Sequence, residues 1–348
     1  MYLYHADALA LGGNLDRPLQ SVVSSQAACS LPPSGGVSSS RVEKFSMNGL
    51  VSFDSAQSDL AGGIEIRKGT QFHVTRVSVV VEGLNVLNMV MADRIVIRMT
   101  SEHGPNDTEP KITTTGCHYD GLRIAGHPVE IETSHNLFSD MPTFADWQKA
   151  WKGKWTRKRV QDCMIGSTLP STPSKTDPQH LKDVHRAVSE QGEAANLKQT
   201  VLSSFVSKVT GITGSKINNW GPIIVVPHFG TIYLGEVIVS YASRRVNMLR
   251  LELGESDEGG FVVGSVESSG SIYPVPIVHA GENMRANFSN ARYTALKTRY
   301  QSLIDRKYMS GLSPAENEEL NRLEHDLDEL DEPYYENALR RLQEGTPS

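Results

Sequence analysis

Three tryptophans and a run of basic residues share one short segment of this 348-residue chain. Trp147, Trp151 and Trp155 follow one another at spacings of four, which places them along one face of an α-helix. The basic residues between and after them are Lys149, Lys152, Lys154, Arg157, Lys158 and Arg159. Indole rings that anchor and cations that attract would together form a docking face for an anionic partner, such as a nucleic-acid backbone, a membrane surface or an acidic protein segment.

The same spacing is typical of a helix that buries its indoles against a sheet while its basic side chains extend into water. Gly153, in the middle of the segment, weakens the helix. We favour burial and keep docking as the alternative. The residues that we single out for partner binding are Trp147, Trp151, Lys152, Lys154, Trp155, Arg157, Lys158 and Arg159.

A second group of reactive side chains lies between residues 117 and 135. Cys117 and His118 are neighbours, but adjacent residues of a strand point to opposite faces, so they do not form a nucleophile and base. Glu130 and Glu132 alternate with apolar residues, as in a strand with one wet face. We therefore expect no catalytic residue, no metal and no cofactor. The alternative is a metal-dependent enzyme or binder that uses His118, Asp120, Glu130 and His135.

Strands are the main elements that position these residues. Runs dense in β-branched residues predict a central sheet at Val74–Leu87, Val90–Met99 and Leu122–Ile131. From Met1 to Gly63, apolar fragments separated by glycine and proline clusters predict short strands joined by tight turns.

Strand patterns return after Pro222. The stretch Pro222–Pro227 is apolar throughout, which predicts a strand buried on both faces. Glu236 is the one carboxylate set in an apolar strand, and we expect it to form an ion pair with Arg244 or Arg245.

Helical patterns occupy two other regions. Thr143 and Asp146 have the spacing of a capping box at the start of the tryptophan helix. After a Pro/Ser/Thr-rich linker at Gly166–Asp177, apolar residues at spacings of three and four predict two helices within His180–Val209. The C-terminal pattern predicts a helix over Ala291–Met309 and a second one that begins at Ser313, with a seam formed by Leu320, Leu323, Leu327 and Leu330 before Pro333.

Together these patterns predict an α+β protein that has a β-rich sandwich or barrel-like core, a helical insertion and a C-terminal helical hairpin. The expected segments are the β-rich first half of the core, the helical insertion with its linker, a second β block that completes the core, and the hairpin; they cover residues 1–138, 139–215, 216–285 and 286–348.

Composition limits the function classes. The net charge of −6 argues against a general binder of nucleic acid or anionic membranes. No apolar run is long enough to span a membrane, and the N-terminus does not resemble a signal peptide, so we expect a cytoplasmic protein or one exported without a classical signal peptide. Three cysteines far apart predict buried free thiols rather than disulfides or a zinc site.

Four stretches of the first part are similar to a known family. Ala6–Gly12, Leu31–Gly36, Val86–Asp93 and Gly121–Val129 resemble the β-rich bacterial surface domains of the choice-of-anchor type over roughly Met1 to Glu132. The resemblance implies a structural or adhesive role. The chain departs from that family because we find neither a signal peptide nor a terminal anchor in it.

The leading hypothesis is therefore a non-catalytic structural or interaction protein that self-assembles or binds a protein partner. A nucleic-acid partner and a membrane span are not expected, and a small-molecule ligand is left open. The alternatives are the metal-dependent enzyme or binder and an effector that docks an anionic partner through the tryptophan helix.

Overall fold

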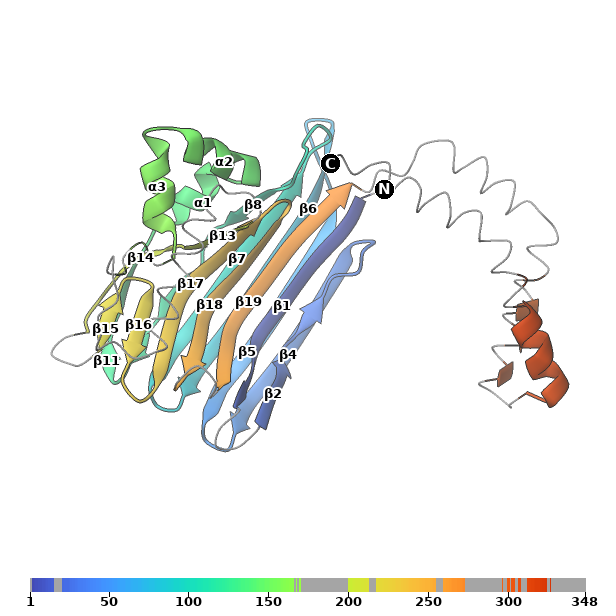
Figure 1. Ribbon diagram of the computed structural model, residues 1–348, viewed down its shortest axis with the longest axis horizontal. Helices are drawn as coiled ribbons and strands as arrows, with labels where there is room; N and C mark the ends of the chain where they lie inside the picture. Colours follow the sequence, from blue (N-terminus) through green and yellow to red (C-terminus); the bar gives the residue numbers. More distant parts are fainter. Residues whose placement is uncertain are drawn as a thin grey trace. The chain divides into compact units, whose positions relative to one another are not determined.

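The computed structural model describes residues 2–15, 21–165, 167, 169, 200–212, 217–254 and 259–272, and, further on, 296, 299–300, 302–303, 306–307, 312–323 and 326. The chain divides into two compact units, Met1–Tyr273 and Pro274–Ser348. The first unit is β-rich and contains every strand described below, with three short helices (Figure 1). The predicted linker at Gly166–Asp177 lies almost wholly outside the described residues.

The larger sheet, which we call sheet A, joins the first strands of the chain to the last ones. Its order is β15–β16–β17–β18–β19–β1–β2, with β13 paired to β17 and β3 paired to β1, all antiparallel. The strands are β1 (Tyr2–Leu15), β2 (Ser21–Gln26), β3 (Cys29–Ser30), β13 (Thr200–Ser204), β15 (Asn218–Trp220), β16 (Ile223–Val226), β17 (Gly230–Ser240), β18 (Ser243–Leu253) and β19 (Gly259–Ile272).

The second sheet, sheet B, is a meander with the order β11–β10–β7–β6–β5–β4, to which β8 and β9 add on β7. Its strands are β4 (Gly36–Met47), β5 (Val51–Arg67), β6 (Thr70–Val86), β7 (Val90–His103), β8 (Lys111–Thr114), β9 (His118–Asp120), β10 (Arg123–Ile124) and β11 (His127–Pro128). A two-stranded sheet pairs β12 (Glu130–Thr133) with β14 (Val206–Thr210). The helices are α1 (His135–Asp140), α2 (Phe144–Lys152) and α3 (Thr156–Cys163).

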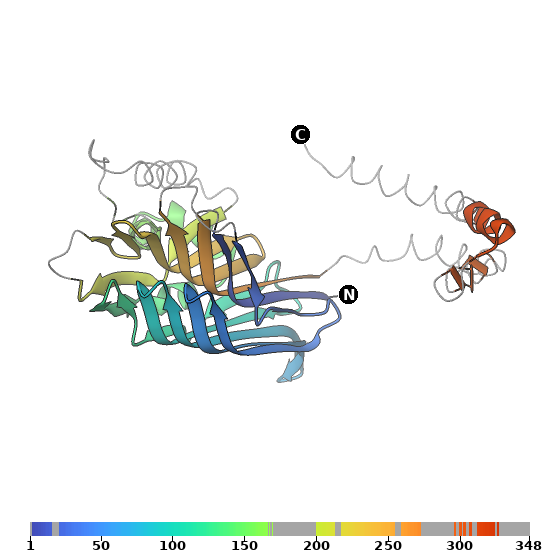
Figure 2. The same cartoon turned by 90° about the horizontal axis from the view of Figure 1, so that it is seen from below.

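Sheets A and B form two layers (Figure 2). One apolar cluster fills the space between them, with members such as Val79 and Ile97 from sheet B and Leu234 and Val263 from sheet A. Alternation along each strand sends these side chains inward and polar ones outward, which is how a β-sandwich is built. The predicted α+β, β-rich fold is confirmed, and its core is a sandwich.

Both sheets contain a line at which the ladder of paired residues is interrupted and then resumes in the same register. In sheet A, the line joins Gly235 of β17, Met248 of β18, Gly264 of β19, Ala10 of β1 and Ala27, which lies between β2 and β3. In sheet B, it joins Lys44, Asp54, Gly83, Asp93 and Gly121. We call these lines the sheet A break and the sheet B break.

The breaks change which side chains of a strand point into the core. Gly235 and Gly264 have φ of 58° and 61°, in the left-handed region that glycine adopts readily. Passing through the break shifts the inward and outward alternation by one residue, so that Met248 and Leu249, although adjacent, both belong to the core. The strands stay amphipathic on both sides of the break, but with opposite phase.

Several sequence predictions are wrong in detail. The strands before Gly63 are long, since β1 has 14 residues and β5 has 17. The pairs Gly12–Gly13 and Gly62–Gly63 lie inside β1 and β5, whereas the predicted turn at Leu31–Gly36 is present. The stretch Leu122–Ile131 contains the separate short strands β10 and β11 and the start of β12 rather than one strand. Residues 200–210 form β13 and β14 instead of a helix, and the rest of that predicted helical region, 180–199, lies outside the described residues.

The C-terminal unit contains the predicted helical hairpin at its described positions. Ser313 and Glu316 form the expected capping contacts, because the Ser313 backbone N–H and hydroxyl both donate to Glu316 at 2.9 and 2.8 Å. Leu303 packs with Leu320 and Leu323. Leu327, Leu330 and Pro333 lie outside the described residues.

Candidate partner-binding surface

Helix α2 begins where the sequence predicts. The Thr143 hydroxyl accepts a hydrogen bond from the Asp146 backbone N–H at 3.1 Å, and the Asp146 carboxylate accepts one from the Thr143 N–H at 3.1 Å. Glu109, from the loop before β8, adds a second cap, because its carboxylate accepts from the N–H groups of Phe144 and Ala145 at 3.0 and 2.9 Å. Two carboxylates therefore neutralise the positive end of the helix.

A buried arginine of sheet A ties the helices to the sandwich. Arg244, 1% exposed, donates to the carbonyl oxygens of Ile112 at 2.6 Å and Phe138 at 3.4 Å, and also to that of Met141. Burial lowers the pKa of Arg244 to about 9, although the charge of Glu109 acts to raise it. The base on which α1 and α2 rest is therefore a network of buried hydrogen bonds.

The tryptophan segment is two helices rather than one. Helix α2 ends at Lys152, and its C-cap Gly153 leaves the helical region with φ −78° and ψ 133°. The Thr156 hydroxyl then donates to the Ala150 carbonyl at 2.6 Å, and α3 starts. A side chain at Gly153 would collide with that hydroxyl, since its Cβ would lie 2.4 Å from Thr156 Oγ1. The prediction that the three indoles share one helix face is wrong for this reason.

The three indoles consequently have three environments. Trp147 is fully buried, packs on Phe138, and donates from its indole N–H to the Met141 carbonyl at 2.9 Å. Trp151 is half-buried, beneath the Arg157 guanidinium at 5.4 Å from the ring centre. Trp155 is 86% exposed. Burial, which we favoured, holds for the first ring and fails for the last.

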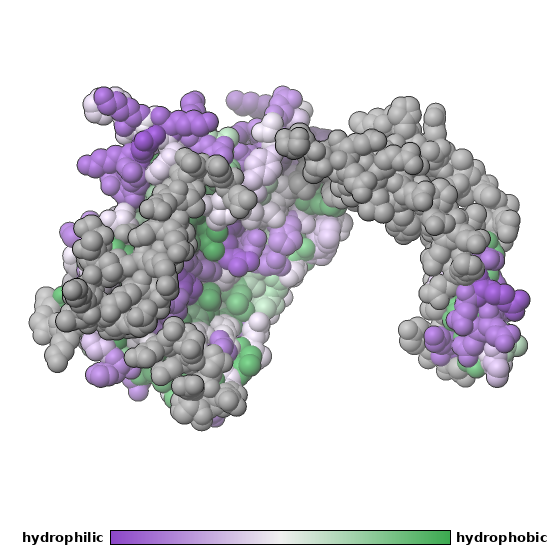
Figure 3. Space-filling model, in the orientation of Figure 1, coloured by the Kyte–Doolittle hydropathy of each residue, from purple (hydrophilic) through white to green (hydrophobic). Residues whose placement is uncertain are grey.

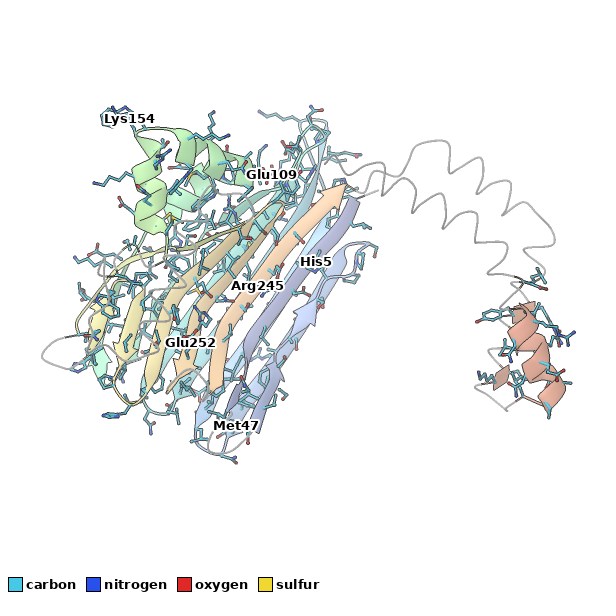
Figure 4. The ribbon with its side chains drawn as sticks, in the orientation of Figure 1. His5, Met47, Glu109, Lys154, Arg245 and Glu252 are labelled. Carbon is cyan, nitrogen blue, oxygen red and sulfur yellow. The ribbon has the colours of Figure 1, made fainter. Side chains whose placement is uncertain are left out.

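One basic side chain lies near the exposed ring, and others are close to it in sequence. Lys154 Nζ lies 5.8 Å from the centre of the Trp155 ring, and Lys154 projects from the helical end of the unit in Figure 4. Arg159 forms an ion pair with Asp140 at 2.9 Å. The helical region is strongly hydrophilic in Figure 3. We call the following exposed or half-exposed residues the tryptophan–lysine surface: Trp151, Lys152, Lys154, Trp155, Arg157 and Lys158.

The alternative site around residues 118–135 is spread over several elements. His118 and Asp120 are exposed on the outer face of β9 and lie 3.5 Å apart, while Cys117 is buried, as strand alternation predicts. Glu130 is exposed on β12, and His135 stacks on Phe205. Within the described part of the chain, no group of three or more His, Cys, Asp or Glu residues could hold a metal ion.

The three cysteines are free, and only Cys117 is fully buried. Burial raises the pKa of the Cys117 thiol to about 11 and that of Cys163 to about 12. Thiols of this kind stay protonated at neutral pH and are poor nucleophiles.

The partner of Glu236 differs from our prediction. Its carboxylate binds Arg250, with Arg250 Nη2 at 2.9 Å, and accepts from the Asn247 amide at 2.7 Å. Arg244 instead anchors the helices, and Arg245 pairs with Glu267. Arg250 is the residue that the sequence reasoning missed; its signal is its place opposite Tyr233 across β17 and β18, which only the strand register reveals.

Comparisons with known proteins identify a family and no individual relative. None of the helices among the described residues is long and apolar enough to cross a membrane. No curated protein and no solved structure matches the chain. A family model described as a domain of unknown function, DUF8256, matches residues 2–240, from the start of β1 to the end of β17. Because this match covers more than half of the 348 residues, the chain belongs to the DUF8256 family.

Proposed function

We propose that this protein is a non-catalytic interaction protein that binds an acidic segment of a partner protein through the tryptophan–lysine surface. The observation that carries the proposal is the exposure of Trp155, at 86%, in the turn between α2 and α3. An indole left in water gains hydrophobic free energy when a partner covers it, and tryptophan is enriched among the residues that dominate binding energies.

Charge gives the surface its preference for an acidic partner. Lys152, Lys154 and Lys158 are all exposed within seven residues of sequence, and none lies within 4.0 Å of a carboxylate of the described residues. Arg159 differs, because Asp140 already neutralises it. Unpaired cations around an indole attract carboxylates and speed their approach.

A protein segment fits this surface better than a nucleic acid does. The chain as a whole carries a net charge of −6, which repels a long polyanion beyond the local patch. Single-stranded nucleic acids also bind along rows of aromatic side chains on which successive bases stack, whereas only Trp155 is fully exposed here. A short acidic segment with an apolar anchor needs one ring and a few cations.

Binding of a synthetic peptide tests the proposal. The probe is a fluorescent peptide of about 15 residues, rich in Asp and Glu with interspersed Leu, and its anisotropy is followed as full-length protein is added. We expect saturable binding that weakens as NaCl rises from about 50 to 500 mM, because salt screens exposed charges. The triple variant K152E/K154E/K158E and the single variant W155S should each raise the Kd by about tenfold or more.

The matched control is Lys68→Glu, which reverses the charge of an exposed side chain in the turn between β5 and β6. It should leave the Kd within about twofold, since it lies outside the surface. Parallel titrations use a single-stranded oligonucleotide of about 20 nucleotides and vesicles with about 30% phosphatidylserine. Binding to either of these probes without binding to the peptide, or equal losses in K68E and the triple variant, contradicts the proposal.

A further inference from the structure

The outer face of sheet A contains a hollow of about 780 Å³, far from the tryptophan–lysine surface in sequence. Its lining comes from β1, β13, β17, β18 and β19, and its volume is within the range of sites for small molecules. In Figure 4, Arg245 and Glu252 lie at two heights along β18 on this face, and hydrophilic and hydrophobic side chains adjoin on it in Figure 3.

The sheet A break explains why the face is hollow there. Along the break, Met248 and Ala10 turn their side chains into the core. A Cβ at Gly264 would lie 3.0 Å from Ile97 in the core, and one at Gly235 would lie 2.9 Å from the Phe205 ring. No side chain of these four residues therefore projects outward. The row on each side of the break still does, and no side chain stands between the two rows on the outer face.

Polar groups along one wall form a directed chain of hydrogen bonds. The Ser265 hydroxyl donates to the Asn247 side-chain carbonyl at 2.7 Å, and the Asn247 amide donates to Glu236 at 2.7 Å. Arg250 reaches across the break and donates from Nε to Glu236 at 3.0 Å. Glu236 and Asn247 are 3% and 6% exposed. Because each donor is already fixed in direction, the wall presents hydrogen-bonding groups in a preorganised geometry.

Both arginines at the hollow are paired with carboxylates, and the remaining charged lining residue, Asp7, lies 3.2 Å from His5. Arg250 also pairs with Glu252, and its guanidinium lies 3.6 Å from the centre of the Tyr233 ring. Arg245 pairs with Glu267. Burial acts to lower the pKa of Arg250, but the charge of Glu236 and the hydrogen bonds to it outweigh burial and raise this pKa. A charged ligand would have to break one of these pairs, whereas a neutral ligand can add hydrogen bonds to them.

Apolar side chains complete the lining. Leu9, Ile238, Val262 and Leu202 are half-buried and flank the polar wall. Ser265 keeps acceptor lone pairs after donating its one hydrogen, and each carboxylate oxygen can accept more than one hydrogen bond. The ligand that matches this combination has several hydroxyl groups, no charge and an apolar face.

We propose that the hollow beside the sheet A break is a binding site for a neutral saccharide. Its hydroxyl groups bind along Ser265, Asn247, Glu236 and Arg250, and the C–H face of a sugar ring packs on Val262 and Leu9. The site is independent of the tryptophan–lysine surface.

Saturation-transfer NMR on the full-length protein tests the site. The probes are the neutral disaccharides maltose, cellobiose, lactose and N,N′-diacetylchitobiose at about 10 mM, a concentration suited to weak binding. We expect saturation transfer to the ring protons of at least one probe. Val262→Trp fills the hollow without removing a hydrogen-bonding group, and it should abolish this transfer. Ser265→Ala removes the first group of the polar wall and should raise the Kd of that sugar by about threefold to tenfold.

The matched control is Val22→Trp, which makes the same change at a β2 residue that is 79% exposed and outside the hollow. It should bind as the unchanged protein does. Circular dichroism and the thermal midpoint of each variant show whether it is folded, and S265A remains as a test if V262W does not fold. No transfer from any of the four sugars, or equal transfer in V262W and V22W, overturns the proposal. So does preferential binding of glucuronate or glucosamine, because both are charged.

Discussion

The Tyr119 hydroxyl of sheet B donates a hydrogen bond to the Met248 carbonyl oxygen of sheet A at 2.6 Å. Met248 belongs to the sheet A break, and Tyr119 is two residues before Gly121 of the sheet B break. A carbonyl in an interrupted ladder lacks its strand partner, so a side chain from the facing sheet can satisfy it. The contact therefore joins the two layers at the place where both ladders are interrupted.

Removing this hydroxyl should destabilise the sandwich. Tyr119→Phe leaves the Met248 carbonyl without its donor, and the expected loss is about 1–2 kcal/mol in the free energy of unfolding. Urea denaturation followed by circular dichroism measures it. The matched control is Tyr241→Phe, whose 63% exposed side chain donates to the Thr108 carbonyl at 3.1 Å. Y241F should lose less than about 0.5 kcal/mol in the free energy of unfolding. Equal losses in Y119F and Y241F would show that the Tyr119 contact has no special role.

The glycines of the sheet A break should resist substitution for two separable reasons. Gly235→Ala meets both the cost of a left-handed φ and a Cβ contact of 2.9 Å with the Phe205 ring. Gly49→Ala meets only the first, because φ is 71° and no atom lies within 4 Å of its Cβ. We expect a loss of about 1–2 kcal/mol for G49A and about 3 kcal/mol or more for G235A, measured as above. A G235A variant no less stable than G49A would mean that Phe205 relaxes freely.

Arg244 should contribute far more to the free energy of unfolding than Arg245 does. Arg244→Met removes the donor from the carbonyls of Ile112 and Phe138 and leaves that of Met141 with only the Trp147 indole N–H, and the expected loss is about 3 kcal/mol or more. The helices should loosen as well, so the fluorescence of the buried Trp147 should shift to longer wavelength. Arg245→Met removes only an exposed ion pair with Glu267 and should cost less than about 1 kcal/mol. Similar losses in the two variants would contradict the anchoring role of Arg244.

The sandwich follows from local patterns that a single sequence displays. Strands β6 and β7 were predicted from their β-branched residues, and the capping box at Thr143 was predicted because all its groups lie within four residues. The two breaks were not predicted, because a single glycine in a strand, such as Gly83 or Gly235, indicates only a local irregularity. That these irregularities line up across five strands depends on register, which the turns and the packed faces determine together.

One region that we predicted to be helical forms strands β13 and β14. Val201, Phe205 and Val209 are spaced by four and read as a helix face. In the structure, β13 ends at Ser204 and β14 starts at Val206, and the Phe205 N–H donates to the carbonyl of Gly235 at 3.0 Å. Residues four apart also lie on one face of a strand, and the buried polar Ser203 between Val201 and Phe205 hides the period of two. The prediction of one tryptophan face failed because α2 ends at Lys152 and Gly153 leaves the helical conformation before Trp155.

Acid should destabilise the first unit through histidines that are held neutral. Burial is the largest cause that lowers the pKa of His135 from 6.5, and the nearby His118 lowers it further, whereas a hydrogen bond to the backbone of Cys117 acts to raise it. Burial and His103 likewise lower the pKa of His73, whose ring stacks on Tyr2 at 4.2 Å. As the pH falls through 6.5, the unfolded chain binds more protons than the folded one. The free energy of unfolding should therefore decrease below pH 6.5 and stay level above it.

His135→Phe provides the test of this pH dependence. His135 Nδ1 is a buried atom without a hydrogen-bond partner among the described residues, and the ring stacks on Phe205, so a phenyl ring can replace the imidazole in shape. We expect H135F to be as stable as the unchanged protein or more so at pH 7.5, and to lose less stability than the unchanged protein between pH 7 and 5. Urea midpoints across that range measure the difference. The control His228→Phe alters an exposed ring between β16 and β17, and if it flattens the pH profile as much as H135F does, burial of His135 is not the cause.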